Sequence, residues 1–347
     1  MRQIISAAAV LALLAPVAYA DSNVTIFGAL DLNARHIQYS GNGSVNSVGS
    51  FGGSPSLLGF RGTEDLGDGL KASFWLETAI LPDTGDTAQS LGLPFWTRGS
   101  WVSLGSDAAG TLRLGRDWSA SYFGQWEFDP TFNLGLGDHL HLTHVDGGFL
   151  WRNNTVQYIT PGNLGGFSAR LMFAPSEGGS AGSYRGGRAA FSGGPYNIAA
   201  SYGSTSNSAG GDFKLAHLGT SYDFGATKVM LLLANSKHGD MSERRWALSS
   251  SVPIGNASLW ASYSKVTVNS AANAGGWFGG GQLAVGGGYA LSKRTGLYAS
   301  ISRLKNDAGG ALSIEEVGSY TFASPGGSKT LSGGSNTGVE FGIRTAF

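Results

Sequence analysis

The sequence contains no cysteine, and only 13% of its 347 residues are charged. Without cysteine, neither a disulfide framework nor a thiolate metal site is available. Lys plus Arg and Asp plus Glu number 23 each, so the chain has no net positive charge with which to hold nucleic acid. Glycine is abundant at 56 residues, which excludes a long helical protein because each glycine in a helix interior costs about 1 kcal/mol.

Long apolar runs are confined to the N-terminus. Arg2 precedes an apolar run over residues 4–17, and Ala18-Tyr19-Ala20 has the small-x-small pattern of a signal-peptidase site. We therefore expect residues 1–20 to be a signal peptide and residues 21–347 to form a single domain. The alternative, a retained anchor, is disfavoured because a spanning helix needs about 20 apolar residues. No later segment resembles a spanning helix, so a membrane-integral fold requires strands.

Apolar and polar residues alternate along many segments of the chain. In residues 24–35, Val24, Ile26 and Leu30 share one parity, and Asp31 and Arg35 lie on the other. A period of two is typical of a strand with one apolar face. The same apolar parity recurs at Leu70, Ala72, Phe74 and Leu76, at Phe167, Ala169, Leu171 and Phe173, at Leu283, Val285, Tyr289 and Leu291, and at Val339, Phe341, Ile343 and Phe347.

Connections between these segments alternate between short turns and long loops rich in Gly, Ser and Asn. Residues 65–69 are an example of a short turn, and residues 117–148 of a long loop. This pattern predicts an all-β fold, a transmembrane antiparallel β-barrel of about 16 strands. A soluble β-sandwich or a β-solenoid would also alternate. In a sandwich, however, charges such as Arg61, Lys71 and Glu77 would lie unpaired in a dry core. We therefore expect the apolar faces to meet lipid and the polar faces to line water.

Several motifs carry a family resemblance. They are Leu58-Gly59-Phe60-Arg61-Gly62-Thr63-Glu64-Asp65-Leu66-Gly67-Asp68-Gly69-Leu70-Lys71-Ala72, Leu114-Gly115-Arg116, Tyr289-Ala290-Leu291-Ser292-Lys293-Arg294-Thr295 and the terminal Phe347. Together they resemble the general diffusion porins of the beta-proteobacterial type. The resemblance implies a 16-stranded barrel in the outer membrane of a Gram-negative bacterium, usually a homotrimer. It also implies that residues 117–148 fold inward as a constriction loop, and that Phe347 acts as the signal read by the outer-membrane assembly machinery.

Candidate constriction residues follow from strand parity and from the resemblance. Parity places Leu57, Gly59, Arg61 and Thr63 inward on the second strand, and Arg98 and Ser100 inward on the fourth. Resembling porins commonly have a lumenal Arg where this chain has Leu57; Arg98 matches another such Arg, and His144 falls near a third basic position. Further wall candidates are Glu77 and Arg113, and the loop offers Glu127, Asp129, Asp138 and Asp146 as an acidic side.

Opposed charges across a narrow water channel create a transverse field that orients polar solutes. We therefore expect a passive pore for small hydrophilic solutes and ions, with no cofactor and no bound metal. Leu57 in place of a common Arg predicts weak selectivity with a slight anion preference. In the alternative arrangement, the same charges pair to hold the loop against the wall.

Aromatic residues suggest a second function, a porin that prefers carbohydrates or aromatic acids, because sugar rings and planar solutes stack on aromatic faces. The loop contains Trp118, Tyr122, Phe123, Trp126, Phe128 and Phe132. These residues could equally anchor the loop or contribute to an interfacial girdle.

Enzyme and adhesin functions are less favoured. Residues 178–182 match the G-x-S-x-G pattern, but they lie in a polar loop and not at a strand-to-helix elbow. An adhesin would be expected to have much larger external loops. His139, His141 and His144 could share a metal ion, although no helix or strand spacing orients them toward one another.

Overall fold

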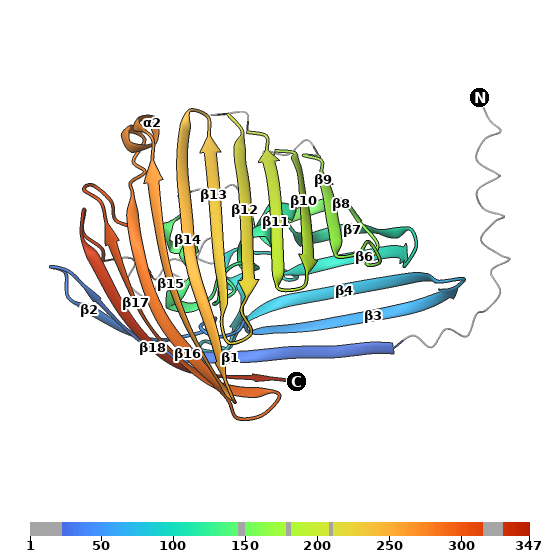
Figure 1. Ribbon diagram of the computed structural model, residues 1–347, viewed down its shortest axis with the longest axis horizontal. Helices are drawn as coiled ribbons and strands as arrows, with labels where there is room; N and C mark the ends of the chain where they lie inside the picture. The colour runs from blue at the N-terminus through green and yellow to red at the C-terminus, as the bar shows by residue number, and fades with distance from the viewer. Residues whose placement is uncertain (1–22, 145–149, 178–181, 208–210, 315–328) are drawn as a thin grey trace.

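The computed structural model describes residues 23–144, 150–177, 182–207, 211–314 and 329–347. The predicted signal peptide, Asp146 and most of the G-x-S-x-G match lie outside the described residues. The described chain is built almost entirely from strands (Figure 1). Its few helices are short, and none has the length and apolarity needed to cross a membrane.

The strands are β1 Asn23–Tyr39, β2 Ser44–Gly49, β3 Leu57–Gly67, β4 Leu70–Leu81, β5 Asp86–Thr87, β6 Gly99–Ser106, β7 Gly110–Trp118, β8 Trp151–Ile159, β9 Phe167–Ala174, β10 Tyr184–Gly193, β11 Tyr196–Thr205, β12 Phe213–Asp223, β13 Lys228–His238, β14 Met241–Ile254, β15 Ala257–Val268, β16 Gly280–Ala290, β17 Thr295–Asn306 and β18 Ser335–Ala346. The helices are η2 Ala88–Leu91, α1 Ala120–Trp126, η3 Gly135–Gly137, η4 His139–Leu142 and α2 Ser270–Ala274.

These strands form one closed antiparallel barrel. Each long strand pairs with the next along the chain, and β1 closes the ring by pairing with β3 on one side and β18 on the other. Two of the eighteen strands, β2 and β5, are short additions of six and two residues, which leaves sixteen in the wall. The predicted fold class, a 16-stranded antiparallel barrel, is confirmed.

The second wall strand is interrupted by an inward bulge. β3 pairs with the first part of β1 through Leu57 and Ala29, and β2 pairs with its later part through Gly49 and Asn33. Residues 50–56 between them leave the wall, and the Asp31 carboxylate accepts hydrogen bonds from Gly52 N at 2.9 Å and Gly53 N at 3.0 Å. Part of what the sequence presents as a long external loop, residues 40–53, therefore lies inside the barrel.

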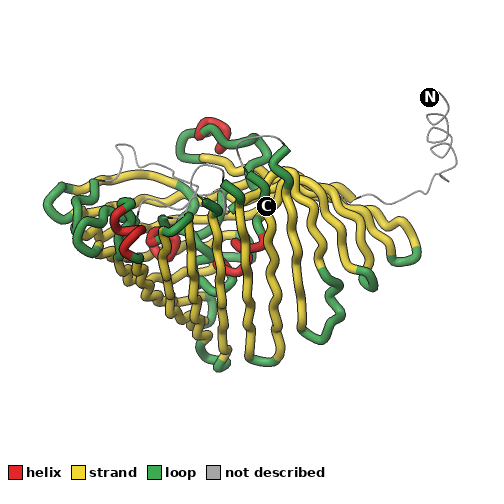
Figure 2. The backbone as a smooth tube through the Cα atoms, turned by 90° about the horizontal axis from the view of Figure 1, so that it is seen from above, coloured by secondary structure: helices red, strands yellow, loops and turns green. Residues whose placement is uncertain are grey.

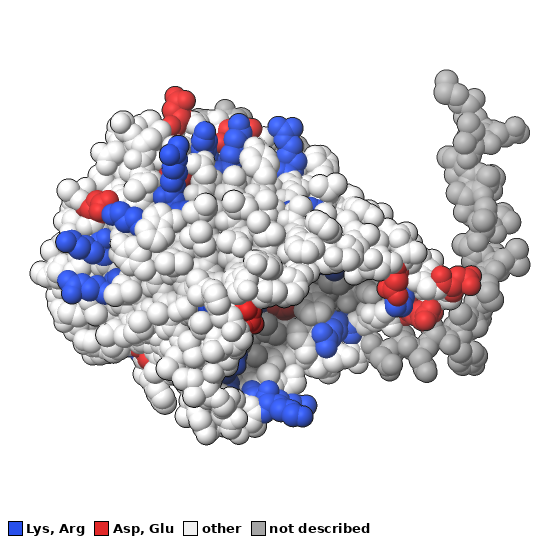
Figure 3. Space-filling view, viewed as in Figure 1, with Lys and Arg blue, Asp and Glu red and all other residues white. Residues whose placement is uncertain are grey.

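The apolar parity seen in the sequence lies on the outer face of the barrel. Exposed side chains there include Val24, Ile26, Phe167, Leu171, Phe173, Leu283, Phe341 and Ile343. Figure 3 shows this uncharged face, with many Lys and Arg side chains gathered near its upper rim. An apolar band flanked by charge is the surface expected of a barrel whose wall faces lipid.

The described part of the connection between β7 and β8 folds inside the barrel (Figure 2). We call its described residues 119–144 the inner loop. Its helix α1 packs against β10, β11 and β12, while η3 and η4 pack against β15 to β18. Phe128 is fully buried, and its ring occupies the space that a side chain at Gly219 would need. The inner loop is therefore fitted to one side of the wall.

Candidate functional site

A cavity of about 310 Å³ lies between the inner loop, the inward bulge and the wall. Its lining consists of Arg35, Ser50, Phe51, Gly53, Ser54, Pro55, Arg98, Trp118, Tyr122, Phe123, Trp126, Phe132, Asn133, Leu134, Leu140, Leu150 and Arg344. A second cavity of about 540 Å³ is lined mainly by β15 to β18 and their turns. The two cavities share Gly53, Ser54, Phe132, Leu134 and Arg344, so they lie next to each other.

Three arginines line the first cavity. Arg35 Nε donates to Glu340 Oε2 at 3.0 Å, and Arg98 is paired with Glu77. Arg344 is exposed, and within the described residues its side chain donates one long hydrogen bond, 3.5 Å, to the carbonyl of Gly53. No carboxylate belongs to this lining in the described part of the chain, so its formal charge is positive.

Aromatic rings form the other main part of the lining. Trp118 stacks on Tyr122 with centroids 4.6 Å apart, and the Arg98 guanidinium lies 4.9 Å from the Trp118 ring. Phe132 lies 5.8 Å from Trp126, is 56% exposed and has a φ of 55°. Aromatic faces beside guanidinium groups suit planar organic anions.

The structure places Leu57 and Arg61 on the inward register of β3. Leu57 lies opposite Ala29 and Ala79. Arg61 is exposed, with its guanidinium 5.2 Å from the Phe27 ring and 5.7 Å from the Trp75 ring. Neither residue lines the two cavities, so Arg61 belongs to a separate part of the inner wall.

The parity argument for Arg98 and Ser100 is wrong. Ser100 pairs with Leu76 and Arg116. Val102, two residues further along β6, is exposed on the outer face, so Ser100 also points outward. Arg98 still reaches the inside because it precedes β6, where strand alternation does not hold, and its side chain contacts Glu77. Glu77 is buried and also accepts from Trp75 Nε1 at 2.9 Å.

Arg113 lines neither cavity and belongs to a group of arginines around Asp117. Its Nη1 donates to Asp117 Oδ2 at 2.7 Å, and its guanidinium lies 3.6 Å from the Trp101 ring. Arg170 also approaches Asp117, at 3.7 Å, and pairs in register with Arg188 on the next strand. Sequence reasoning missed Arg188 and assigned no role to Arg170 beyond its polar parity.

The loop carboxylates do not face Arg98. Glu127 pairs with Arg188 and accepts from Asn197 Nδ2 at 2.9 Å. Asp129 is 1% exposed and accepts from both N and Oγ1 of Thr131, at 2.8 and 2.7 Å. Among the described residues, Glu127 and Asp129 therefore do not pair with Arg61, Arg98 or Arg113 as predicted: Glu127 meets a different wall arginine, Arg188, and Asp129 meets Thr131.

His144 also attaches the inner loop to the wall. Its Nδ1 lies 2.9 Å from Glu243 Oε2, and its Nε2 accepts from the backbone N of Phe278 at 3.2 Å. With the Glu127 pair, these contacts match the alternative in which the charges hold the loop against the wall.

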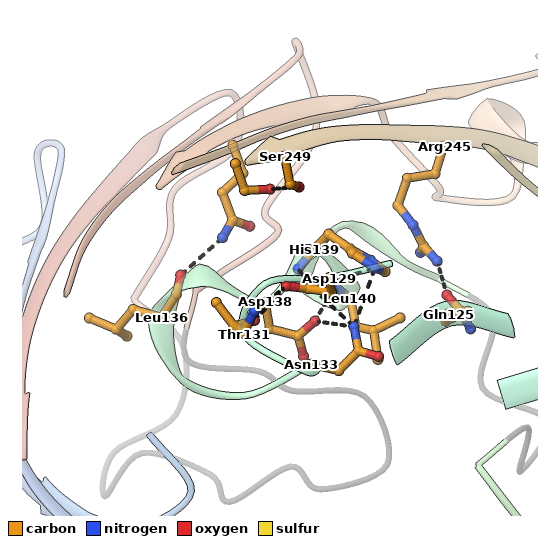
Figure 4. Close-up of polar contacts among 12 residues, drawn as sticks. Gln125, Asp129, Thr131, Asn133, Leu136, Asp138, His139, Leu140, Arg245 and Ser249 are labelled. Atoms are coloured by element: carbon orange, nitrogen blue, oxygen red, sulfur yellow. Dashed lines mark hydrogen bonds and ion pairs between the residues drawn. The ribbon is translucent and has the colours of Figure 1, made fainter. Parts of the chain in front are cut away.

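The three loop histidines do not converge. His139 and His141 are buried, whereas His144 is held by Glu243. Burial lowers the pKa of His141 to about 3. Burial, together with the nearby carboxyl of Asp129, raises the pKa of Asp138 to about 8. Figure 4 shows that His139 instead lies with Asp129, Asn133 and Asp138.

Arg35 and Arg344 are lining residues that the sequence reasoning did not select. Both have the polar parity of their strands, which was the available signal. Arg35 is on β1 and Arg344 on β18, and these strands become neighbours only when the barrel closes. The inward bulge that completes the cavity had no recognisable signal.

Comparisons with known proteins agree with this architecture. The family model described as "Gram-negative porin" matches residues 7–309. The chain is 35% identical to outer membrane porin protein 32 of Delftia acidovorans over 95% of each chain. It is 29% identical to an outer membrane porin protein of Bordetella pertussis, over 89% of this chain and 95% of that one.

A solved structure gives the same result. The anion-selective porin from Comamonas acidovorans superposes with a TM-score of 0.82 at 32% identity, covering 94% of this chain and 100% of that one. The trimer form of OmpT from Vibrio cholerae has the same fold, with a TM-score of 0.66 at 14% identity. The chain therefore belongs to the Gram-negative porin family, whose members are β-barrel channels of the outer membrane and not enzymes.

Proposed function

We propose that the protein is a diffusion pore for small hydrophilic solutes and ions, with a weak preference for anions. The anion preference is supported by the lining of the first cavity. Among the described residues, this lining contains Arg35, Arg98 and Arg344 but no aspartate or glutamate. Fixed positive charge on the wall of a narrow aqueous passage attracts anions and repels cations.

The preference is proposed as weak because most of this positive charge is compensated. Glu340 pairs with Arg35 and Glu77 pairs with Arg98, which leaves Arg344 as the lining arginine without an ion pair in the described chain. Leu57 adds no further charge where resembling porins commonly have an arginine. The anion-selective porin from Comamonas acidovorans supports the sign of the preference.

Reversal potentials in planar bilayers under a salt gradient test this proposal. Arg344→Glu changes the lining charge by two units. One unit charge about 8 Å away in water is worth about 0.5 kcal/mol, so a change of two units raises the energy of an anion and lowers that of a cation by about 1 kcal/mol each. The anion-to-cation permeability ratio should therefore fall roughly thirtyfold before screening by salt. Arg303→Glu is the matched control, because Arg303 lies on the neighbouring β17 in the outward register of Ile301. Equal reversal potentials for wild type and Arg344→Glu would contradict the proposal.

A preference for planar organic anions is a second candidate. The stacked Trp118 and Tyr122, with the Arg98 guanidinium beside them, present an aromatic face and a positive charge to the same cavity. Carbohydrates would use the aromatic face alone, whereas aromatic carboxylates would use both features. Competition of benzoate and acetate with chloride current separates this candidate from simple anion preference.

We also propose that the protein assembles as a homotrimer in the outer membrane. The outward side chains of Val24, Ile26 and Leu30 on β1 and of Phe341 on the neighbouring β18 are exposed and apolar, on the two strands that close the barrel. Such a surface suits a subunit contact as well as lipid. Light scattering in detergent and unheated gel migration at three times the monomer mass would support the trimer; monomer mass in both would contradict it.

A further inference from the structure

Four side chains at the base of the inner loop point toward one another (Figure 4). Asn133 Nδ2 lies 3.2 Å from Asp129 Oδ2, 3.0 Å from Asp138 Oδ1 and 3.3 Å from His139 Nε2. Asp129 Oδ2 and His139 Nε2 are 3.5 Å apart. All four residues are buried, and the ligand atoms of the two aspartates and the histidine lie within 4.8 Å of one another.

The hydrogen bonds among these groups are incomplete. The Asn133 amide has two N–H groups for three surrounding acceptors. Within the described chain, Asp138 Oδ2, Asn133 Oδ1 and His139 Nδ1 are buried without any hydrogen-bond partner. An unpartnered buried polar atom costs about 1–3 kcal/mol, and of these three atoms Asn133 Oδ1 is the one that a ligand at the centre of the cluster would satisfy, once the amide is rotated.

The charge of the cluster is compensated only in part, because one wall cation acts on both aspartates. The nearest wall cation is Arg245, whose Nη2 donates to Gln125 rather than to Asp129 or Asp138. Among the described residues, no Lys or Arg forms an ion pair with either aspartate. Two neighbouring carboxylates buried in this way call for a cation or a proton between them.

The distances favour a metal ion. A tetrahedral site with metal–ligand bonds of about 2.0–2.1 Å has ligand atoms about 3.3–3.4 Å apart. Four of the six edges, at 3.0, 3.2, 3.3 and 3.5 Å, bracket that spacing, and the other two, from Asp138 to Asp129 and to His139, are within 4.8 Å. We propose that Asp129, Asn133, Asp138 and His139 form a structural zinc site, with Zn²⁺ at the centre of the tetrahedron that their side-chain atoms define.

The amide of Asn133 would bind through its oxygen. The two ends of an amide are nearly the same shape, and rotation by half a turn places Oδ1 where Nδ2 now lies. Two carboxylates, one imidazole and one amide oxygen then form a nitrogen–oxygen donor set of a kind that zinc accepts. The two carboxylate charges balance that of Zn²⁺.

The position of this site gives it a mechanical role. Its ligands flank Phe132 and Leu134, which line both cavities, and Phe132 has the strained φ of 55°. A metal bound at positions 129, 133, 138 and 139 fixes the chain on both sides of those lining residues. The proposed ion is therefore a clamp for the inner loop, bound directly behind the lining through Asn133, which also lines the first cavity.

Metal analysis of the full-length protein tests the site. The protein is isolated from outer membranes of cells grown with Zn²⁺, dialysed against a chelator and analysed by mass spectrometry for metals. We expect about one Zn²⁺ per chain in the wild type and a loss of roughly tenfold or more in Asp138→Asn and His139→Gln. His141→Gln is the matched control, because His141 is buried on the same short helix but outside the cluster, and it should retain the wild-type zinc content.

A second measurement keeps the test independent of variant folding. The wild type refolded from denaturant with Co²⁺ in place of Zn²⁺ should show the intense visible absorption of tetrahedral cobalt. Zinc retention that is equal in wild type and Asp138→Asn would overturn the proposal, as would a weak octahedral cobalt spectrum in the wild type. None of these readouts depends on conduction through the pore.

Discussion

Arg35 and Glu340 form an ion pair, with 3.0 Å between Nε and Oε2, across the junction of the first and last strands. The other oxygen of Glu340 accepts from the backbone N of Leu136 at 3.1 Å and from Ser300 Oγ at 2.8 Å. One buried carboxylate thus joins the closing strands of the barrel to the inner loop and compensates a lining arginine.

Replacing Glu340 by Gln should increase the anion preference. The change removes one negative charge beside the cavity, which at about 8 Å in water lowers the energy of an anion and raises that of a cation by about 0.5 kcal/mol each, roughly a fivefold rise in the anion-to-cation permeability ratio before screening by salt. Reversal potentials under a salt gradient measure it. Ser300→Ala removes one hydrogen bond to the same carboxylate without changing charge, so it should leave the reversal potential unaltered. A shift toward cations in Glu340→Gln would contradict the assignment of Arg35 to the conducting path.

The terminal Phe347 should be required for insertion. Its backbone N donates to Gly28 O at 3.0 Å and its carbonyl accepts from Gly28 N at 3.2 Å, while its ring packs over Gly28. Deletion should reduce the barrel recovered from outer membranes several-fold. Phe347→Tyr, which keeps the ring, should insert normally.

A companion variant separates the assembly signal from packing at the junction. Gly28→Val meets both the ring of Phe347 and the backbone carbonyl of Leu57 on β3, and it retains Phe347 itself. If Phe347 acts as a signal, this variant should reach the membrane and lose only thermal stability. A failure of Gly28→Val to insert as severe as that of the deletion would show that packing alone explains the requirement.

The barrel could be predicted from the sequence because lipid imposes a simple rule on each strand. Alternate residues must be apolar along the whole wall, so Val24, Leu171 and Phe341 signal their orientation without knowledge of their neighbours. The alternation of short turns and long loops also indicates the direction in which each strand runs through the barrel wall. The inward bulge at residues 50–56 breaks that alternation and depends on the distant contact with Asp31, so nothing local identifies it.

The lining was harder to predict because it depends on partners that are far apart in the sequence. Parity shows that Arg35 and Arg344 face inward, but not that they share a cavity. Glu127 and Asp129 lie on the inner loop as expected, yet which cation or backbone group each meets depends on the path of that loop. Arg98 is inward for a reason that alternation does not capture, since it precedes its strand.

Docking of the inner loop should depend on Gly219. A side chain at this position meets the ring of the fully buried Phe128, so Gly219→Val should displace that ring. Burying a Phe side chain contributes about 1.5–3 kcal/mol, and its loss should loosen the loop and produce noisier, larger single-channel currents. Phe128→Ala in the Gly219→Val background removes the clash and should quieten the currents relative to Gly219→Val alone. Identical recordings for wild type and Gly219→Val would show that this contact does not hold the loop.

Phe132 should lengthen the residence of aromatic anions in the pore. The ring is 56% exposed, lies 5.8 Å from Trp126 and lines both cavities, so a planar solute passing between them can stack on it. Aromatic pairs contribute about 0.5–1.5 kcal/mol beyond area burial, so Phe132→Ala should shorten benzoate-induced current blocks roughly two- to tenfold.

Acetate has no ring, and its effect on the chloride current should be the same in both proteins. Phe95→Ala is the matched control, because Phe95 is also exposed but lines neither cavity. Benzoate blocks of equal length in wild type and Phe132→Ala would leave simple anion preference as the better description of the pore.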